Sequence, residues 1–267
     1  MSRIAATFEA LAKSGRKALI PFITAGDPNP DFTLPMMHAM VEAGADVIEL
    51  GVPFSDPMAD GPVIQRASER ALAHKMSLRR VLGIAIEFRK TNQHTPLVLM
   101  GYVNPIEAMG YEDFANAAQR AEIDGVLTVD LPIEEAVENI ILLKARDIDP
   151  IFLLAPNSTD ERIKIMGTAG SGYLYYVSLK GVTGAGHLDV ADVEAKLNQI
   201  RANTSLPVAI GFGVKNAKTA NTVSGLGDGV VVGSALISKI EENLDDLERA
   251  KSEIVRLLSS MREAMDS

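Results

Sequence analysis

The feature that most constrains this chain is an alternation, along its whole length, of short apolar runs and longer segments with helical periodicity. Four longer segments repeat apolar residues with a period near 3.6, at residues 31–43, 78–89, 136–145 and 244–265. The runs rich in Val, Ile and Leu lie at residues 18–24, 46–50, 96–102, 125–129, 150–154, 173–178, 207–211 and 229–233. Strands that alternate with helices pair in parallel through right-handed crossovers. Eight such units predict a single (β/α)8 TIM barrel domain over residues 1–267.

The composition excludes several classes of function. A net charge of −9 repels both phosphate backbones and anionic membranes, so neither a nucleic acid nor a membrane is expected as a partner. The absence of Cys rules out disulfides, thiolate metal sites and a Cys nucleophile. No apolar stretch reaches the roughly 18 residues that a membrane span needs. Residues 1–15 have the pattern of an extra amphipathic helix and not of a signal peptide, so a cytoplasmic location is expected.

The second apolar run carries a carboxylate, Glu49, near the strand end where such a barrel places its active site. Glu49 has the strand parity of Val47 and the opposite parity to Ile48, so it is expected to face the barrel mouth while Ile48 faces the helices. Desolvation there would raise the pKa of the carboxyl, which suits proton transfer near neutral pH. The alternative is a rim carboxylate that pairs with a nearby base or with solvent.

A second carboxylate, Asp60, follows in a loop dense with Pro, Gly and Asp. Taken alone, Asp60 would be a capping residue ahead of a helix that begins at Pro62. Taken with Glu49, it resembles the pattern in which two carboxylates in unlike environments divide the proton transfers of one reaction.

Two late loops are typical of a phosphate site. Residues 211–216 follow the seventh apolar run and residues 233–237 follow the eighth, and each loop is glycine-rich and leads into a helical segment. Glycine lets backbone N–H groups approach a dianion, and a helix N-terminus favours negative charge. Since this barrel usually binds phosphate at loops seven and eight, a phosphate ester is the expected substrate class.

The sixth loop, residues 179–189, is either a plain connection or a lid that closes over the site, ahead of a helix expected near Asp189. Five residues at other strand ends are either core or the lining of a pocket for a flat apolar group: Phe22, Met100, Tyr102, Leu127 and Tyr175. No metal site is expected, because the four His residues show no ligand spacing. No serine-hydrolase motif occurs, and Lys180 is the only Lys near a strand end.

Five segments, "PFITAGDP", "ELGVPFSDPMADGPVIQ", "GVTGAG", "GFGV" and "VVVGSA", occur in this order. Together they closely resemble the tryptophan synthase alpha chain family, over nearly the entire chain. The resemblance implies a lyase of tryptophan biosynthesis that cleaves indole-3-glycerol phosphate to indole and glyceraldehyde 3-phosphate. The implied reaction is a retro-aldol cleavage without cofactor or metal in this chain.

The resemblance also implies roles for individual residues. Glu49 would be the catalytic acid and base, Asp60 would stabilise charge at the indole N–H, and Tyr175 would lie beside both. Thr183 would belong to the lid and hydrogen-bond Asp60, and Asp56 would contact a partner chain. The other implied pocket residues are Phe22, Ile64, Met100, Leu127 and Phe212. The implied phosphate-binding residues are Gly184, Gly213, Gly233 and Ser234.

The implied partner is a beta chain that carries pyridoxal phosphate, in an αββα hetero-tetramer. The chain departs from the family at Ser178–Lys180, where many members carry Arg shortly before the Gly-Val-Thr-Gly element. Two other readings stay open. One is a sister phosphate-binding barrel enzyme of the same pathway. The other is a non-catalytic module that binds a phosphorylated metabolite and regulates a partner.

Overall fold

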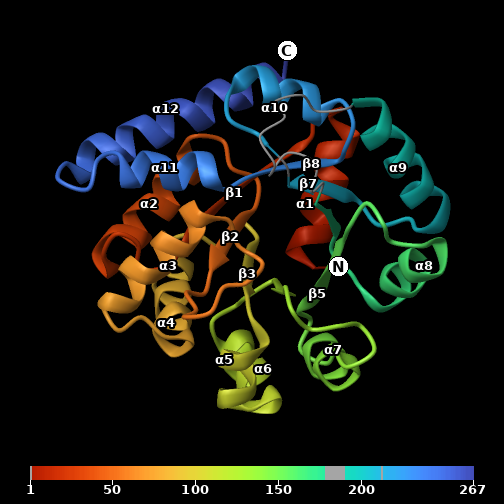
Figure 1. The fold of residues 1–267 in the computed structure, drawn as a ribbon, viewed down its shortest axis with the longest axis horizontal. Helices are drawn as coiled ribbons and strands as arrows, with labels where there is room; N and C mark the ends of the chain where they lie inside the picture. The colour runs from red at the N-terminus through yellow and green to blue at the C-terminus, as the bar shows by residue number, and fades with distance from the viewer. Residues whose placement is uncertain (1, 178–189, 212) are drawn as a thin grey trace.

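A closed barrel of eight parallel strands forms the centre of the molecule (Figure 1). The computed structural model describes residues 2–177, 190–211 and 213–267. Each strand pairs with its neighbours in chain order, and the last pairs with the first. The strands are β1 (Ala18–Thr24), β2 (Ile48–Gly51), β3 (Leu97–Gly101), β4 (Gly125–Thr128), β5 (Asp149–Leu154), β6 (Leu174–Tyr176), β7 (Val208–Gly211) and β8 (Gly229–Val232). The predicted (β/α)8 barrel is therefore confirmed, with a strand in each of the eight apolar runs.

Helices pack around the barrel, the first of them across one end and the others along its outside (Figure 1). They are α1 (Arg3–Lys13), α2 (Pro30–Glu42), α3 (Pro62–Ala73), α4 (Leu78–Arg89), α5 (Val103–Met109), α6 (Tyr111–Arg120), α7 (Val137–Lys144), α8 (Asp160–Ala169), α9 (Val190–Asn203), α10 (Ala217–Ser224), α11 (Ser234–Glu241) and α12 (Leu247–Met265).

The four predicted helical segments match α2, α4, α7 and α12, with one boundary in error. The last helix begins at Leu247 and not at Leu244, because the side chain of Asp246 accepts a hydrogen bond from the N–H of Arg249 and caps it. None of the helices among the described residues is long and apolar enough to cross a membrane.

Alternate residues along the strands belong to two different apolar cores. Ile48 and Leu50 belong to the core between the sheet and the surrounding helices. Val47 belongs to the core inside the barrel, together with Ile20 and Val98. Residues two apart on a strand face the same side, so Glu49 shares the interior side with Val47, as its parity predicts.

Helix α1 packs against the barrel interior at the N-terminal ends of the strands. Its buried residues Ile4, Phe8 and Leu11 belong to the interior core, and the ring of Phe8 lies 5.6 Å from the ring of Tyr173. The predicted N-terminal amphipathic helix is thus present, and its apolar face covers the end of the barrel opposite to the expected site.

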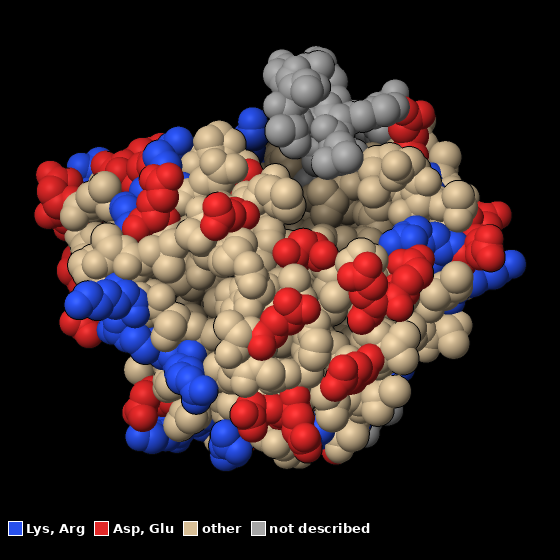
Figure 2. Space-filling view, turned by 60° about the horizontal axis from the view of Figure 1, so that its bottom comes forward, with Lys and Arg blue, Asp and Glu red and all other residues tan. Residues whose placement is uncertain are grey.

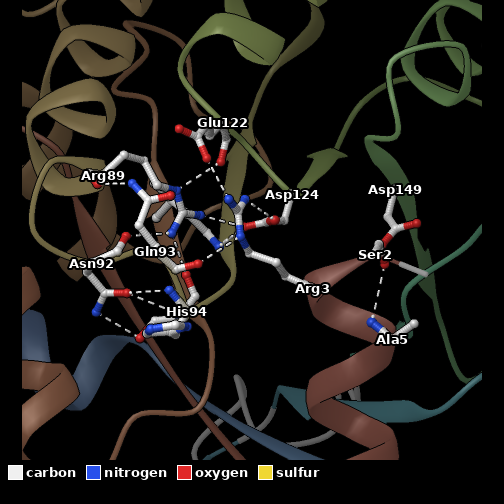
Figure 3. Close-up of polar contacts among 12 residues, drawn as sticks. Ser2, Arg3, Ala5, Arg89, Asn92, Gln93, His94, Glu122, Asp124 and Asp149 are labelled. Atoms are coloured by element: carbon white, nitrogen blue, oxygen red, sulfur yellow. Dashed lines mark hydrogen bonds and ion pairs between the residues drawn. The ribbon is translucent and has the colours of Figure 1, made fainter.

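A buried carboxylate, Asp124, anchors this helix (Figure 3). Asp124 accepts hydrogen bonds from Arg3 at 2.9 Å, from Arg89 at 2.5 Å and from the backbone N–H of Leu97 at 2.8 Å. Arg3 also donates to Glu122 at 2.5 Å. The network joins α1, α4, the start of β3 and the segment before β4, so it ties the helix to the barrel.

Candidate active site

A cavity of about 410 Å³ opens at the C-terminal ends of the strands. Its lining includes eight of the residues expected at the site: Phe22, Asp60, Ile64, Met100, Tyr175, Gly213, Gly233 and Ser234. A larger groove, of about 810 Å³, lies at the opposite end, beside α1 and the loops that precede β5 to β8. Because active sites of this fold lie at the C-terminal face, the smaller cavity is the candidate active site.

Glu49 lies inside the barrel and is fully buried, with 0% of its surface exposed. It pairs in register with Phe22 of β1 and with Val98 of β3. Its Oε1 accepts a hydrogen bond of 2.5 Å from the hydroxyl of Tyr173. Its Oε2 has no hydrogen-bond partner within the described part of the chain. One carboxylate oxygen is therefore held by the protein, and the other is unpaired within the described residues; Glu49 itself is not among the described residues that line the cavity.

Burial raises the pKa of Glu49 to about 7, against an ordinary value of 4.5. The hydrogen bond from Tyr173 acts in the opposite direction, because it stabilises the carboxylate. A group with a pKa near 7 is populated in both protonation states at neutral pH. Such a group can both donate and accept a proton in one catalytic cycle.

Asp60 lies in the loop between β2 and α3 and is partly buried. Its Oδ2 accepts a hydrogen bond from the hydroxyl of Tyr102 at 3.0 Å, and the same hydroxyl accepts one from the N–H of Ala59 at 3.0 Å. Helix α3 has Gly61 as its N-cap, without a side-chain cap. The capping role considered for Asp60 is therefore wrong, and its carboxylate lines the cavity instead.

The two carboxylates differ in their surroundings. Burial raises the pKa of Asp60, and the hydrogen bond from Tyr102 opposes that rise. Tyr102 directly follows β3. Its ring stacks on that of Phe54, which lies in the same loop as Asp60, with a distance of 5.1 Å between the ring centroids. Tyr102 thus holds the loop at two points, by its ring and by its hydroxyl.

Tyr175 projects from β6 into the barrel and lines the cavity. Burial raises the pKa of its phenol well above the ordinary value, and the negative charges of Glu49 and Asp60 raise it further. Tyr175 is therefore a neutral phenol whose pKa responds to the charges of both carboxylates. Its hydroxyl would lie 2.0 Å from a Cβ placed at Gly211, so only glycine on β7 leaves room for the ring.

Tyr173 is the residue that inspection of the sequence missed. It precedes β6 and has the same parity as Tyr175, so both side chains lie in the interior core. That shared parity is the signal that could have identified it. The signal does not by itself reveal which of the two phenols contacts Glu49.

The apolar wall of the cavity agrees only in part with expectation. Phe22, Ile64 and Met100 line the cavity. Leu127 is not among the described lining residues: it is 1% exposed and belongs to the packed interior core. Leu127 pairs in register with Met100, which does line the cavity, but the side chain of Leu127 is packed among its interior neighbours. Thr183 and Phe212 lie outside the described residues.

The cavity ends at the N-terminus of α11. Gly233 caps α11 without a side-chain hydrogen bond, whereas α10 has a capping box formed by Asn216 and Thr219. The first N–H groups of α11 are therefore open to a ligand, and a helix N-terminus attracts an anion. Gly213 has a positive φ of 56° and no atom within 4 Å of a Cβ built on it. Gly184 and the rest of the sixth loop lie outside the described residues.

Asp56 lies on the exposed rim of the second loop. Its Oδ2 accepts a hydrogen bond of 2.6 Å from the hydroxyl of Ser55. Met58, two residues away, is 84% exposed. An exposed methionine beside an exposed carboxylate is suited to a contact with another protein. Among the described residues, no group of three or more His, Asp or Glu could hold a metal ion.

Comparisons with known proteins agree with this geometry. The family model described as "Tryptophan synthase alpha chain" matches residues 8–266. A protein of that name from Methylococcus capsulatus is 61% identical over 267 residues, with 100% of both chains covered. The crystal structure of tryptophan synthase subunit alpha from Legionella pneumophila has a TM-score of 0.94 and 45% identity, and covers 100% of this chain and 99% of that chain. A chain of the tryptophan synthase complex from Pyrococcus furiosus has a TM-score of 0.82 and 37% identity, with 92% and 98% covered.

Proposed function

The chain belongs to the tryptophan synthase alpha chain family, and from this premise we propose how its residues divide the work of the family's reaction. The function of the family is the cleavage of indole-3-glycerol phosphate in tryptophan biosynthesis, so the chain is a carbon–carbon lyase. The products are indole and glyceraldehyde 3-phosphate. The observation that carries the proposal is the buried Glu49, with one oxygen held by Tyr173 and the other without a hydrogen-bond partner among the described residues.

Glu49 acts as both acid and base in a retro-aldol cleavage. It first donates its proton to C3 of the indole, which turns the ring into a positively charged indolenine. It then accepts the proton of the glycerol hydroxyl on the carbon next to C3, and that carbon becomes an aldehyde. The carbon–carbon bond breaks, and its electron pair returns to the ring and neutralises the charge. Glu49 ends the cycle with the proton count at which it began, which a pKa of about 7 permits.

Asp60 supports the ring at its other end. As C3 gains a proton, positive charge develops at the indole N–H, and a carboxylate that accepts this hydrogen bond stabilises it. Tyr102 holds Asp60 in place, and Tyr175 lies close enough to both carboxylates for their charges to raise its pKa. Phe22, Ile64 and Met100 form an apolar wall for the flat ring.

The phosphate group binds at the far end of the cavity. The open N-terminus of α11, at Gly233 and Ser234, supplies backbone donors, and Gly213 leaves space for the phosphate oxygens. We assign Thr183, Gly184 and Phe212 to the same site from the resemblance to the family alone.

The family works with a beta chain, and the Pyrococcus furiosus neighbour is a complex. We propose that this chain assembles with such a partner as an αββα hetero-tetramer in the cytoplasm, and that pyridoxal phosphate belongs to the partner. Asp56 is proposed to contact the beta chain. No nucleic-acid or membrane partner is proposed, since the net charge is −9 and carboxylates occupy the centre of the face in Figure 2.

The test of the site assignment is indole release from indole-3-glycerol phosphate by the purified chain, compared with the Glu49→Gln variant. Glu49→Gln preserves the shape of the side chain and removes its proton, so turnover should be lost while binding of the phosphate ester is retained. A variant that kept most of the wild-type rate would overturn the role of Glu49.

The test of the partnership is to titrate a cognate beta chain into a fixed amount of this chain. The cleavage rate should rise, because docking would order the second loop and exclude water from the site. Asp56→Asn should weaken that activation and leave the rate of the isolated chain unchanged. A constant rate across a titration that demonstrably forms the complex would contradict activation.

A further inference from the structure

A cluster of four charged residues at the catalytic end of the barrel has no part in the reaction just described. Asp27 lies in the loop after β1, Arg66 and Arg70 lie on α3, and Glu241 is the last residue of α11. We call this cluster the α3–α11 brace. None of its members is among the described residues that line the cavity. Helix α11 packs against α3 beside the barrel (Figure 1).

Arg70 is the residue of the brace that contacts both carboxylates. Its Nε and Nη2 donate to the two carboxylate oxygens of Asp27 at 2.6 and 3.0 Å, and its Nη1 donates to Oε1 of Glu241 at 3.0 Å. Arg66 adds a second two-point contact to Glu241, at 2.6 and 2.7 Å. One guanidinium group therefore connects three separate elements of the chain.

Burial distinguishes the brace from an ordinary surface ion pair. The side chain of Asp27 is 0% exposed, and that of Arg70 is 18% exposed. Exposed pairs contribute little because water and salt screen them, whereas removing one partner of a buried pair leaves an uncompensated charge. The two-point geometry also fixes the orientation of both groups. The brace therefore holds its three elements in one relative position.

The two braced helices both begin at the cavity, and their first residues form two separate parts of its lining. Helix α3 begins at Pro62, two residues after Asp60, and α11 begins at Ser234, directly after Gly233. Arg70 and Glu241 lie about 10–12 Å along their helices from those starting points, at 1.5 Å per residue. A change in the contact between the helices would therefore move one of these parts of the lining relative to the other.

We propose that Arg70 is a positioning residue that keeps the Asp60 end of the cavity and the Gly233–Ser234 end at the separation that a linked indole–phosphate substrate requires. The inference rests on the proposed function, which assigns the indole to the first end and the phosphate to the second. A ligand that spans two subsites gains affinity only while the subsites stay at the spacing of its linker. Loosening the brace costs this gain and leaves each separate subsite intact.

The experiment compares half-ligands with a linked ligand on full-length Arg70→Met. The half-ligands are indole and glycerol 3-phosphate, and the linked ligand is an indole-3-propyl phosphate, which has no hydroxyl and cannot be cleaved. We expect the Kd of the linked ligand to rise about 10-fold and the Kd of each half to change less than about twofold. KM for indole-3-glycerol phosphate should rise by a similar factor, with kcat changed less than about threefold, because the brace does not touch Glu49. Arg70→Lys should recover part of the loss.

Two further variants keep the test decisive. Lys239→Met is the matched control, because Lys239 lies on α11 with Glu241 but pairs with Glu242 and with Glu253 of α12. The ligand affinities of this variant should equal those of the wild type. If Arg70→Met does not fold, Glu241→Gln loosens only the α11 arm and should give the same selective loss at smaller size.

Equal weakening of the halves and the linked ligand, or no weakening at all, would overturn the role of Arg70. The result is separable from the proposed function. A wild-type chain that does not cleave indole-3-glycerol phosphate would refute the function, whatever the variants bind. A wild-type chain that cleaves it, with variants that bind the linked ligand normally, would refute the brace alone.

Discussion

Tyr173 donates its phenolic hydrogen to Oε1 of Glu49 over 2.5 Å, with both side chains fully buried inside the barrel. The contact stabilises the carboxylate, while burial favours the protonated acid. These opposed effects leave the pKa of Glu49 at about 7. The proton-transfer chemistry assigned to Glu49 depends on this balance.

Removal of that hydroxyl in Tyr173→Phe should raise the pKa of Glu49. We expect the corresponding inflection in the pH profile of kcat/KM to move up by about one pH unit, the equivalent of one hydrogen bond to a charged group. Tyr111→Phe is the control, because it removes a phenolic hydrogen bond to Glu107 on the surface and should leave the profile unchanged. A profile that does not move in Tyr173→Phe would contradict this balance.

Glu49 should also make stability depend on pH. The pKa of its carboxyl is higher in the folded chain than its ordinary value of 4.5, so the folded state binds the proton more tightly than the unfolded state. The stabilisation of the folded state by this protonation is therefore complete below pH 4.5 and is lost as the pH rises through 7. We therefore compare the free energy of unfolding of Glu49→Gln with that of the wild type at pH 5 and at pH 8. The difference should shift in favour of the variant between these two values, by up to about 3 kcal/mol. Urea unfolding at both values measures this, and parallel pH curves for the two proteins would refute it.

Tyr102→Phe tests whether the loop that carries Asp60 needs its anchor. The change keeps the ring on Phe54 and removes the hydroxyl shared by Asp60 and Ala59. We expect kcat/KM for indole-3-glycerol phosphate to fall about 10-fold, which is less than the 10²–10⁴-fold loss expected for Asp60→Asn. Equal losses in the two variants would mean that Tyr102 acts on the substrate directly, and no loss would mean that the anchor is unnecessary.

Gly233→Val tests the anion end of the cavity. A Cβ at Gly233 would lie 3.5 Å from the ring of Phe22, an ordinary contact, so the fold should survive while the space for phosphate shrinks. KM for the phosphate ester should rise about 10-fold, with little change in the affinity for free indole. Gly83→Ala is the control: Gly83 lies inside α4 with open space around it, and its replacement should stabilise the chain by about 1 kcal/mol without altering KM. Similar loss of affinity for both ligands would indicate misfolding instead.

Asp124→Asn should destabilise the chain without impairing the site. The carboxylate holds two guanidinium groups and a backbone N–H at the end of the barrel away from the cavity (Figure 3). We expect the free energy of unfolding to fall by about 3 kcal/mol, the cost of breaking a buried ion pair. The kcat/KM of the folded fraction should be unchanged. Glu9→Gln, which breaks only an exposed pair with Lys13, should unfold like the wild type. A variant as stable as Glu9→Gln would show that the network does not hold α1 in place.

The fold could be predicted from the sequence because its signals are local. Apolar runs of strand length, separated by segments of period 3.6, specify parallel pairing, and strand parity places Glu49 inside the barrel. Where such a local signal was misread, a nearby contact was responsible. The cap formed by Asp246 delays the start of α12. Gly61, and not Asp60, takes the capping position of α3.

The sequence by itself determined the order of the elements, the side of the sheet that each strand residue faces, and the loops that gather at the active end. The tertiary structure alone decided the height of each residue along the barrel, because height depends on how the strands are staggered when the barrel closes. Tyr173 and Tyr175 share a parity, yet Tyr173 contacts Glu49 and Phe8 while Tyr175 lines the cavity. Leu127 and Met100 are likewise register partners, yet only Met100 is among the described residues that line the cavity. The pKa of Glu49 and the brace around Arg70 also depend on contacts between residues far apart in the chain, and local periodicity carries no information about such contacts.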